Sequence, residues 1–238
     1  MIHGYVLHFL CALAPALALS GCGSEGPTDL PPSIEWAQVP WAQGTVNVAL
    51  VRPVNEAAGP HPVVFALPWG SGSADLVEGF IQSYWLTEPA ARGYYVVAPE
   101  VRGSTLDATS DEIIPAIFDW MESELSFDAS KVALVGASNG GRGAFFAALS
   151  QPDRFHALVG LPGLYRGPPA DLAVLAGKPI WFMVGEFDDD WLTGTEATIA
   201  ALQSQGITAE LNVIPGQGHV LSLSDTALLD WIDAALRR

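Results

Sequence analysis

The chain has 238 residues, of which 50% are hydrophobic, and 26 acidic against 10 basic side chains give it a formal net charge of -16. This hydrophobic content excludes a disordered chain, and the length suits one domain with a full core. The negative charge argues against a nucleic-acid-binding protein, because phosphates require a basic face, and it disfavours strongly anionic polymers as substrates.

The first 21 residues form an apolar stretch that ends in small residues, which indicates a secretory signal peptide. Its last residues and the next one, Leu19-Ser20-Gly21-Cys22, resemble the bacterial lipobox, whose cysteine is acylated with chains such as palmitate. That resemblance implies a lipoprotein of the bacterial cell envelope, anchored to a membrane through Cys22. An ordinary cleaved signal peptide with an incidental cysteine is the alternative, and the absence of Lys or Arg before the apolar stretch is atypical.

Residues 22–33 contain Gly, Ser and Pro and are predicted to form a tether. Residue 23 is glycine, not the aspartate that usually retains lipoproteins at the inner membrane. We therefore expect the outer membrane where the source has one.

Residues 34–238 are predicted to form one catalytic domain, in which strand patterns alternate with helical ones. Strands separated by helices predict an α/β fold with a mostly parallel sheet, helices on both faces and a site at the carboxyl ends of the strands. The expected elements are strands 34–39, 45–51, 62–67, 94–98, 131–135, 156–161, 179–184 and 209–214, and helices 74–92, 107–125, 143–149, 195–205 and 224–236.

Ser138 lies in the sequence Gly136-Ala137-Ser138-Asn139-Gly140, between a predicted strand and a predicted helix. Gly-x-Ser-x-Gly in that position is the nucleophile elbow, a turn so tight that the residues two before and two after the serine must lack side chains. The sequence therefore predicts Ser138 as a nucleophile.

A serine hydroxyl needs a histidine to accept its proton and a carboxylate to orient that histidine. His219 follows the last predicted strand in a Gly-x-Gly-His loop, whereas the other four histidines stand in less suitable places. The acid is expected to be Asp188, three residues past Gly185, although Asp189 and Asp190 are alternatives. A metal site formed by three consecutive carboxylates is disfavoured, because neighbouring side chains diverge.

The order Ser138, Asp188, His219, each just past a strand, resembles that of the α/β-hydrolase superfamily. The short single-domain layout is similar to dienelactone hydrolases and small esterases, whereas Ser-Asn-Gly-Gly resembles the elbow of prolyl-oligopeptidase-type enzymes. The resemblance implies a serine hydrolase that cleaves carboxylic esters through an acyl-enzyme, without a cofactor or metal. A peptidase of the prolyl-oligopeptidase type and a non-catalytic binding lipoprotein are the alternatives.

The family builds its oxyanion hole from the N–H group after the nucleophile, here Asn139, and a second N–H group in the loop after the third strand. Ungapped matching places the second donor at Gly70, and a shift of one residue would place it at Trp69 or Ser71. Trp69 and Trp191 flank the oxyanion and acid loops and are candidates for the substrate pocket, with core packing as the alternative. The segment after residue 161 is too short for a helical lid domain.

Overall fold

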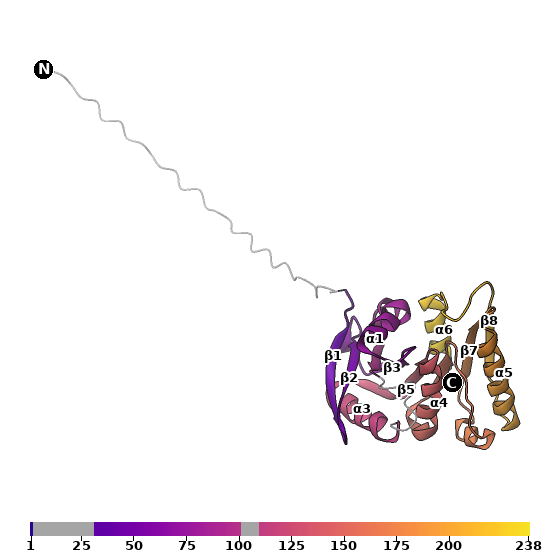
Figure 1. Cartoon of the computed structure of the whole chain (residues 1–238). Helices are drawn as coiled ribbons and strands as arrows, with labels where there is room; N and C mark the ends of the chain where they lie inside the picture. The colour runs from indigo at the N-terminus through magenta and orange to yellow at the C-terminus, as the bar shows by residue number, and fades with distance from the viewer. Residues whose placement is uncertain (2–30, 101–109) are drawn as a thin grey trace.

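The computed structural model describes residue 1, residues 31–100 and residues 110–238. They form an eight-stranded sheet in the order β1-β2-β4-β3-β5-β6-β7-β8. The hairpin β1–β2 occupies one edge and β8 the other (Figure 1). The strands are β1 (Glu35–Trp41), β2 (Gly44–Val51), β3 (His61–Leu67), β4 (Tyr95–Pro99), β5 (Phe127–Gly136), β6 (Ala157–Gly160), β7 (Ile180–Gly185) and β8 (Glu210–Ile214).

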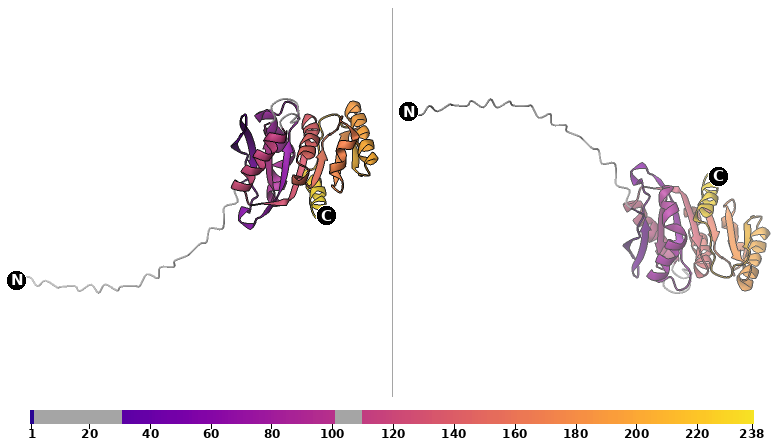
Figure 2. Two further views of the ribbon diagram at one scale, coloured as in Figure 1. Left: turned by 90° about the horizontal axis from the view of Figure 1, so that it is seen from below. Right: turned by 90° about the horizontal axis from the view of Figure 1, so that it is seen from above.

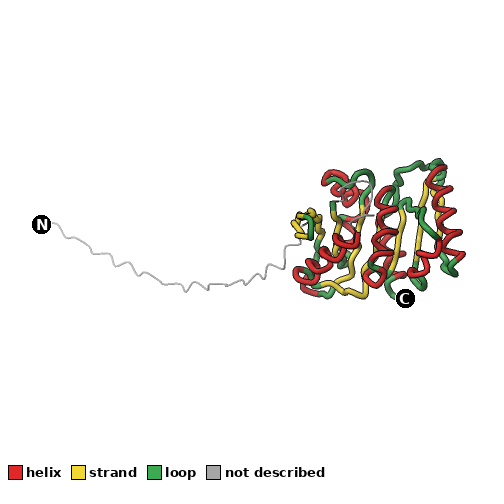
Figure 3. The backbone as a smooth tube through the Cα atoms, turned by 60° about the horizontal axis from the view of Figure 1, so that its bottom comes forward, coloured by secondary structure: helices red, strands yellow, loops and turns green. Residues whose placement is uncertain are grey.

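Two helical layers cover the sheet (Figures 2 and 3). Helices α3 (Ser110–Glu124), α4 (Asn139–Ser150) and α5 (Asp189–Ser204) pack on one face. Helices α1 (Ala74–Phe80), α2 (Thr87–Ala91) and α6 (Asp225–Ala235) pack on the other. The short helical segments are η1 (Glu56–Ala58), η2 (Ile81–Trp85), η3 (Pro152–Arg154) and η4 (Pro169–Leu175).

From β4 to β8 the neighbouring strands run parallel, and β1 and β2 join them as an antiparallel lead-in. Sheets covered on both faces contain strands that are apolar along their whole length. Six of the seven residues of β3 and the last five of β5 are buried, and all of them except His61 are apolar. The predicted α/β fold is confirmed.

The strand order reverses around β3, because the chain passes from β3 to β4 on one side and then returns to β5 on the other. Helix α1 follows β3 on one face of the sheet, and α4 follows β5 on the opposite face. The two connections diverge, and in open α/β sheets ligands bind at the carboxyl ends of the strands beside such a reversal. The loop after β3 and the elbow after β5 lie at this point.

Three predicted helices differ from the observed ones. The helix expected over 143–149 begins four residues earlier, at Asn139. The helix expected over 74–92 is divided into α1, the π-helical η2 and α2. Pro89 has no N–H group to donate to residue 85, so a continuous α-helix would lack that bond. Helix α5 begins at Asp189, six residues before the predicted start, because Asp189 and Asp190 suit the positive end of a helix dipole.

The predicted leader, the lipidation residue Cys22 and most of the tether lie outside the described residues. Within the described residues, no helix has both the length and the apolar character needed to cross a bilayer.

Candidate active site

Ser138 stands between β5 and α4 with φ 56° and ψ -116°. Among the described residues it is the one non-glycine with positive φ. L-amino acids avoid this region because of contacts with Cβ, and a residue held there stores strain of about 1–3 kcal/mol. The turn lifts the hydroxyl out of the strand and presents it at the carboxyl edge of the sheet.

The glycines of the elbow are required by backbone contacts. A Cβ at Gly136 would lie 2.2 Å from the carbonyl oxygen of Gly140, and one at Gly140 would lie 2.2 Å from that of Leu67. Gly140 belongs to α4 and Leu67 to the central strand β3, so neither backbone atom can move without displacing one of these elements. The predicted need for small residues on both sides of Ser138 therefore agrees with the geometry, and Gly140 brings the elbow against the end of β3.

The structure brings together the three residues that the sequence singled out. Ser138 Oγ lies 2.8 Å from His219 Nε2, and His219 Nδ1 lies 2.7 Å from Asp188 Oδ2. Asp188 is the last residue before α5, whereas Asp189 and Asp190 lie exposed in its first turn. Of the three consecutive aspartates, Asp188 is the one whose carboxylate contacts the imidazole.

The loop that carries His219 is fixed by hydrogen bonds on both sides. Gln217 and Ser222 close it, since Ser222 N donates to Gln217 Oε1 at 2.7 Å and Gln217 Nε2 donates to Ser222 O at 3.1 Å. The Tyr84 hydroxyl donates to the carbonyl of Leu221. His219 is thus held in position although its side chain is 41% exposed.

The acid loop and the histidine loop also contact each other directly. Phe187 N donates to Gln217 O at 2.8 Å, and Gly216 N donates to the Glu186 carboxylate at 2.7 Å. A Cβ at Gly185 would lie 2.1 Å from the carbonyl oxygen of Gly218. These contacts set the spacing between Asp188 and His219.

The loop predicted to complete the oxyanion hole, residues 67–72, lies against the elbow. Asn139 Nδ2 donates to the carbonyl oxygen of Gly70 at 3.0 Å. Gly70 has φ 67°, and a Cβ there would lie 2.8 Å from the Leu76 side chain. Asn139 is the first residue of α4, where backbone N–H groups have no partner within the helix. The side chain of Asn139 therefore fixes the loop beside its own N–H group.

Two exposed apolar side chains adjoin triad residues in the chain. Phe187 precedes Asp188 and Val220 follows His219, and these two side chains are 70% and 71% exposed. Between β6 and β7 the chain forms only the short η4 segment, and no lid domain is present in the described part of the chain.

The two candidate pocket tryptophans lie in different surroundings. Trp69 makes edge contacts with Phe80 and Tyr84, at centroid distances of 5.1 and 6.1 Å, and belongs to the packing of α1 and η2. Trp191 packs against the His219 ring at 5.2 Å and has the Arg142 guanidinium 4.7 Å above its own ring. Sequence reasoning missed Arg142, although it lies one helical turn after Ser138.

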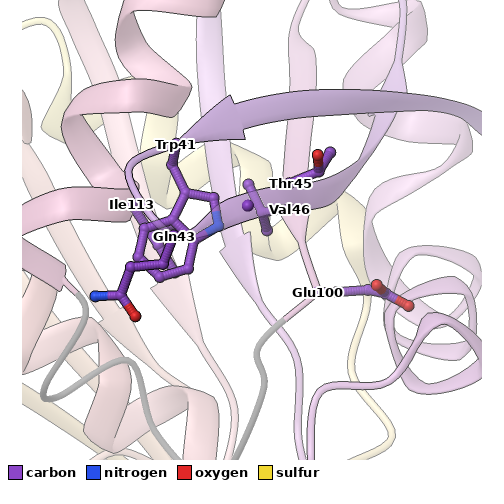
Figure 4. Close-up of a pocket in the computed structure, with 7 residues that line it drawn as sticks. Trp41, Gln43, Thr45, Val46, Glu100 and Ile113 are labelled. Carbon is purple, nitrogen blue, oxygen red and sulfur yellow. The ribbon is translucent and has the colours of Figure 1, made fainter.

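A separate cavity of about 450 Å³ lies between the β1–β2 hairpin and α3 (Figure 4). Trp41 and Ile113 form its apolar wall, and Glu100 lies on its far side. Asn47 Nδ2 donates to the Glu100 carboxylate at 2.7 Å. No local sequence pattern predicts this cavity, because its wall combines a hairpin turn with a helix that is distant in the chain.

Comparison with known proteins agrees with this geometry. The family model described as "Putative esterase" matches residues 79–220, more than half of the chain, and this range contains Ser138, Asp188 and His219. No curated protein matches the sequence significantly.

Among solved structures, a thermostable esterase superposes with a TM-score of 0.67 at 17% identity, covering 85% of this chain and 62% of that one. A protein described as a putative dienelactone hydrolase, from Klebsiella pneumoniae, gives 0.62 at 21% identity, covering 88% of this chain and 100% of that one. An acylaminoacyl peptidase from Pyrococcus horikoshii gives 0.66 at 14% identity and 88% coverage, but this chain spans only 42% of its length. A putative dipeptidyl aminopeptidase IV from Bacteroides ovatus gives 0.65 at 18% identity and 87% coverage, with 36% of its length spanned.

The match over residues 79–220 shows that the chain belongs to the esterase family, and the solved structures show that it has the fold of α/β-hydrolases.

Proposed function

We propose that the protein is a carboxylesterase that uses Ser138, His219 and Asp188 as its triad. The observation that carries the proposal is the continuous chain of hydrogen bonds from the Ser138 hydroxyl through His219 to Asp188. Ser138 itself stands on a strained elbow at the carboxyl edge of the sheet. A hydroxyl in this arrangement can give its proton to the imidazole as it attacks a carbonyl carbon.

The reaction follows from the positions of the atoms. His219 Nε2 accepts the Ser138 proton and then returns it to the oxygen of the departing alcohol, which leaves the acyl group on Ser138. Asp188 accepts a hydrogen bond from His219 Nδ1–H and stabilises the imidazolium. A water molecule activated by His219 then releases the acid.

The negative charge on the carbonyl oxygen develops beside the elbow. The N–H group of Asn139 and an N–H group of the loop at Trp69 and Gly70 are assigned to it, because the Asn139 side chain holds this loop next to the elbow. Donors fixed before the reaction need no reorganisation as charge develops, which is why such holes contribute strongly to the rate.

The experiment compares the purified protein with Ser138→Ala. The unmodified protein should hydrolyse p-nitrophenyl acetate and butyrate and should react covalently with a fluorophosphonate probe, whereas S138A should do neither and should remain folded by circular dichroism. Hydrolysis by S138A at the rate of the unmodified protein would contradict the assignment. Failure of the unmodified protein to react with the probe would favour the non-catalytic binding protein.

A serine peptidase is the second candidate, favoured by the Ser-Asn-Gly-Gly elbow and by the fold similarity to acylaminoacyl peptidases. The chain spans only 42% of the length of those peptidases. We expect the protein to cleave esters with a larger kcat/KM than aminoacyl or prolyl anilides. A larger kcat/KM for the anilides would reverse this order.

We also propose that the protein is a lipoprotein of the cell envelope, acylated at Cys22 and held at the outer membrane where the source has one. The support is the sequence Leu19-Ser20-Gly21-Cys22 at the end of the apolar leader. Metabolic labelling with an alkyne analogue of palmitate should mark the unmodified chain and spare Cys22→Ser. Equal labelling of both chains would exclude acylation at Cys22.

A further inference from the structure

A second cavity, of about 500 Å³, lies directly beside the triad. Trp191 forms the boundary between the two, because its ring packs on the His219 ring at 5.2 Å and also lines the cavity. The cavity lies between α4, the segment that leads to η4, and the first turns of α5, and its lining includes Arg142, Leu164, Arg166, Asp190, Trp191 and Gly194.

Arg142 is half-buried in this wall and incompletely bonded. Its guanidinium stacks over Trp191 at 4.7 Å, and Nη1 donates to Asn139 Oδ1 at 3.3 Å. The Nε–H group is buried and has no hydrogen-bond partner among the described residues. Burial, together with the positive charge of Arg166, lowers the pKa of Arg142. The negative charge of an anion bound in the cavity would raise this pKa again.

Arg166 is brought to the same cavity by a segment that α5 holds in place. Thr195 Oγ1 donates to the carbonyl of Gly163 at 2.8 Å, and Tyr165 N donates to Thr198 Oγ1 at 2.8 Å. Both threonines are fully buried. The backbone that carries Arg166 is therefore fixed, while its side chain is exposed and free to close on a ligand.

Arg142 and Arg166 line one cavity without a carboxylate partner. In the described ranges neither forms an ion pair with a carboxylate, although Asp190 lines the same cavity and is exposed. Of the other described cations, Arg52, Arg92, Lys131 and Arg154 form ion pairs, whereas Lys178, Arg237 and Arg238 form none with described residues. The two arginines are distinguished by their shared place in the wall of this cavity.

We propose that this cavity is a subsite for a carboxylate carried by the ester substrate, bound by Arg142 and Arg166. The inference rests on the proposed esterase function and specifies its substrate class: small esters that combine an apolar body with one carboxylate. Guanidinium groups match the planar carboxylate and bind it through charge-assisted hydrogen bonds. The net charge of -16 disfavours ligands with several negative charges, so a single carboxylate fits best.

The test uses two ester pairs that differ only in one negative charge. In the first pair the carboxylate is on the acyl side: p-nitrophenyl hemiadipate against its methyl ester. In the second it is on the alcohol side: 4-acetoxybenzoate against methyl 4-acetoxybenzoate. We expect kcat/KM to favour the charged member of at least one pair by about tenfold or more, the effect of one or two charge-assisted bonds. The pair that shows the preference identifies the side on which the carboxylate lies.

Arg166→Gln is the main variant, because the side chain is exposed and its loss should not disturb folding. It should reduce the charged-to-neutral ratio of kcat/KM about tenfold. Arg142→Gln should reduce it as well. Lys131→Gln removes the same charge at an exposed position within β5, outside the lining of the cavity, and should keep the ratio of the unmodified protein. A ratio near one in the unmodified protein, or one that R166Q and R142Q leave unchanged, would overturn the proposal.

Binding to the inactive protein separates this inference from the esterase proposal. Calorimetry on S138A should detect monomethyl adipate and should show binding of dimethyl adipate at least about tenfold weaker. The doubly substituted S138A/R166Q protein should lose the difference. Equal binding of the two esters would exclude the carboxylate subsite even if neutral esters are hydrolysed. Binding without any turnover by the unmodified protein would keep the subsite and reject the esterase.

Discussion

The backbone strain at Ser138 can be measured by comparing two substitutions that both remove the nucleophile. Ser138→Ala keeps a Cβ at φ 56° and ψ -116°, whereas Ser138→Gly removes it. Both variants lose the hydrogen bond to His219 and should lose turnover. Their difference in stability therefore reports the cost of holding an L-residue in this conformation.

The magnitude follows from two opposing effects. Relief of strain should stabilise the glycine variant by about 1–3 kcal/mol. The greater freedom of glycine in the unfolded chain costs about 0.5–1 kcal/mol. We expect S138G to be more stable than S138A by about 1 kcal/mol, or about 2–4 °C in Tm for a domain of this size.

The assay is urea denaturation followed by tryptophan fluorescence, supported by calorimetric Tm values. Asp119 supplies a matched control, because it is exposed and lies inside the regular helix α3. There the order should reverse, with Asp119→Gly less stable than Asp119→Ala by about 0.5–1 kcal/mol. If S138G is no more stable than S138A while the Asp119 pair behaves as stated, the reasoning from strain is refuted.

Three further predictions concern the triad, the oxyanion loop and the response to alkali. Asp188→Asn should lower kcat on the order of 10⁴-fold, because it favours the wrong histidine tautomer. Asp189→Asn should change kcat little, and equal losses in the two variants would contradict the assignment of the acid. Asn139→Ala keeps the backbone N–H but releases the oxyanion loop, so kcat should fall about 5–10-fold with KM nearly constant, and an unchanged kcat would contradict this positioning role. Burial and the hydrogen bond to Asp171 raise the pKa of Tyr165 from 10.0, its value in the unfolded chain, to about 12 in the folded protein. The neutral Tyr165 hydroxyl therefore contributes fully to the free energy of unfolding below pH 10.0, and this contribution is lost as the pH rises towards 12. In Tyr165→Phe the free energy of unfolding, measured by urea denaturation, should fall less steeply across this pH range. Identical pH profiles of the free energy of unfolding in the two proteins would exclude the effect.

The elbow was predictable because its chemistry is local. The glycines around Ser138 are required by contacts within the turn and with the end of β3, and both follow from a strand–turn–helix pattern visible in the sequence. The order of serine, aspartate and histidine then placed the other two residues past strands that the structure makes neighbours. Local patterns therefore located the candidate site.

The choice among three aspartates depended on the start of a helix. Sequence reasoning placed the start of the helix at residue 195 and chose Asp188 by its spacing from Gly185, with Asp189 and Asp190 as alternatives in the same loop. With α5 beginning at Asp189, Asp188 is the last residue outside the helix and contacts His219. Gly194 obscured this start because glycine disfavours helices, yet here a Cβ would lie 2.6 Å from Leu164. Close packing against a distant segment, which the sequence pattern does not encode, explains the glycine within the helix.

The two arginines of the cavity also differ in how far the sequence predicts their positions. Arg142 lies four residues after Ser138, so its place beside the nucleophile follows from helical spacing alone. Arg166 stands in a segment without periodicity, and hydrogen bonds between that segment and the side chains of Thr195 and Thr198 hold it against α5. A cation in such a segment has no predictable neighbour.

The elbow and the triad are fixed by different contacts, and this separation makes the inactive protein informative. Gly136 and Gly140 set the backbone of the turn through contacts with other backbone atoms, none of which involves the Ser138 hydroxyl. His219 is held by the closed loop between Gln217 and Ser222 and by Asp188. Removal of the hydroxyl should thus leave the oxyanion loop, the imidazole and the arginine cavity in place. Ligand affinities measured on S138A therefore describe the site in which the reaction takes place.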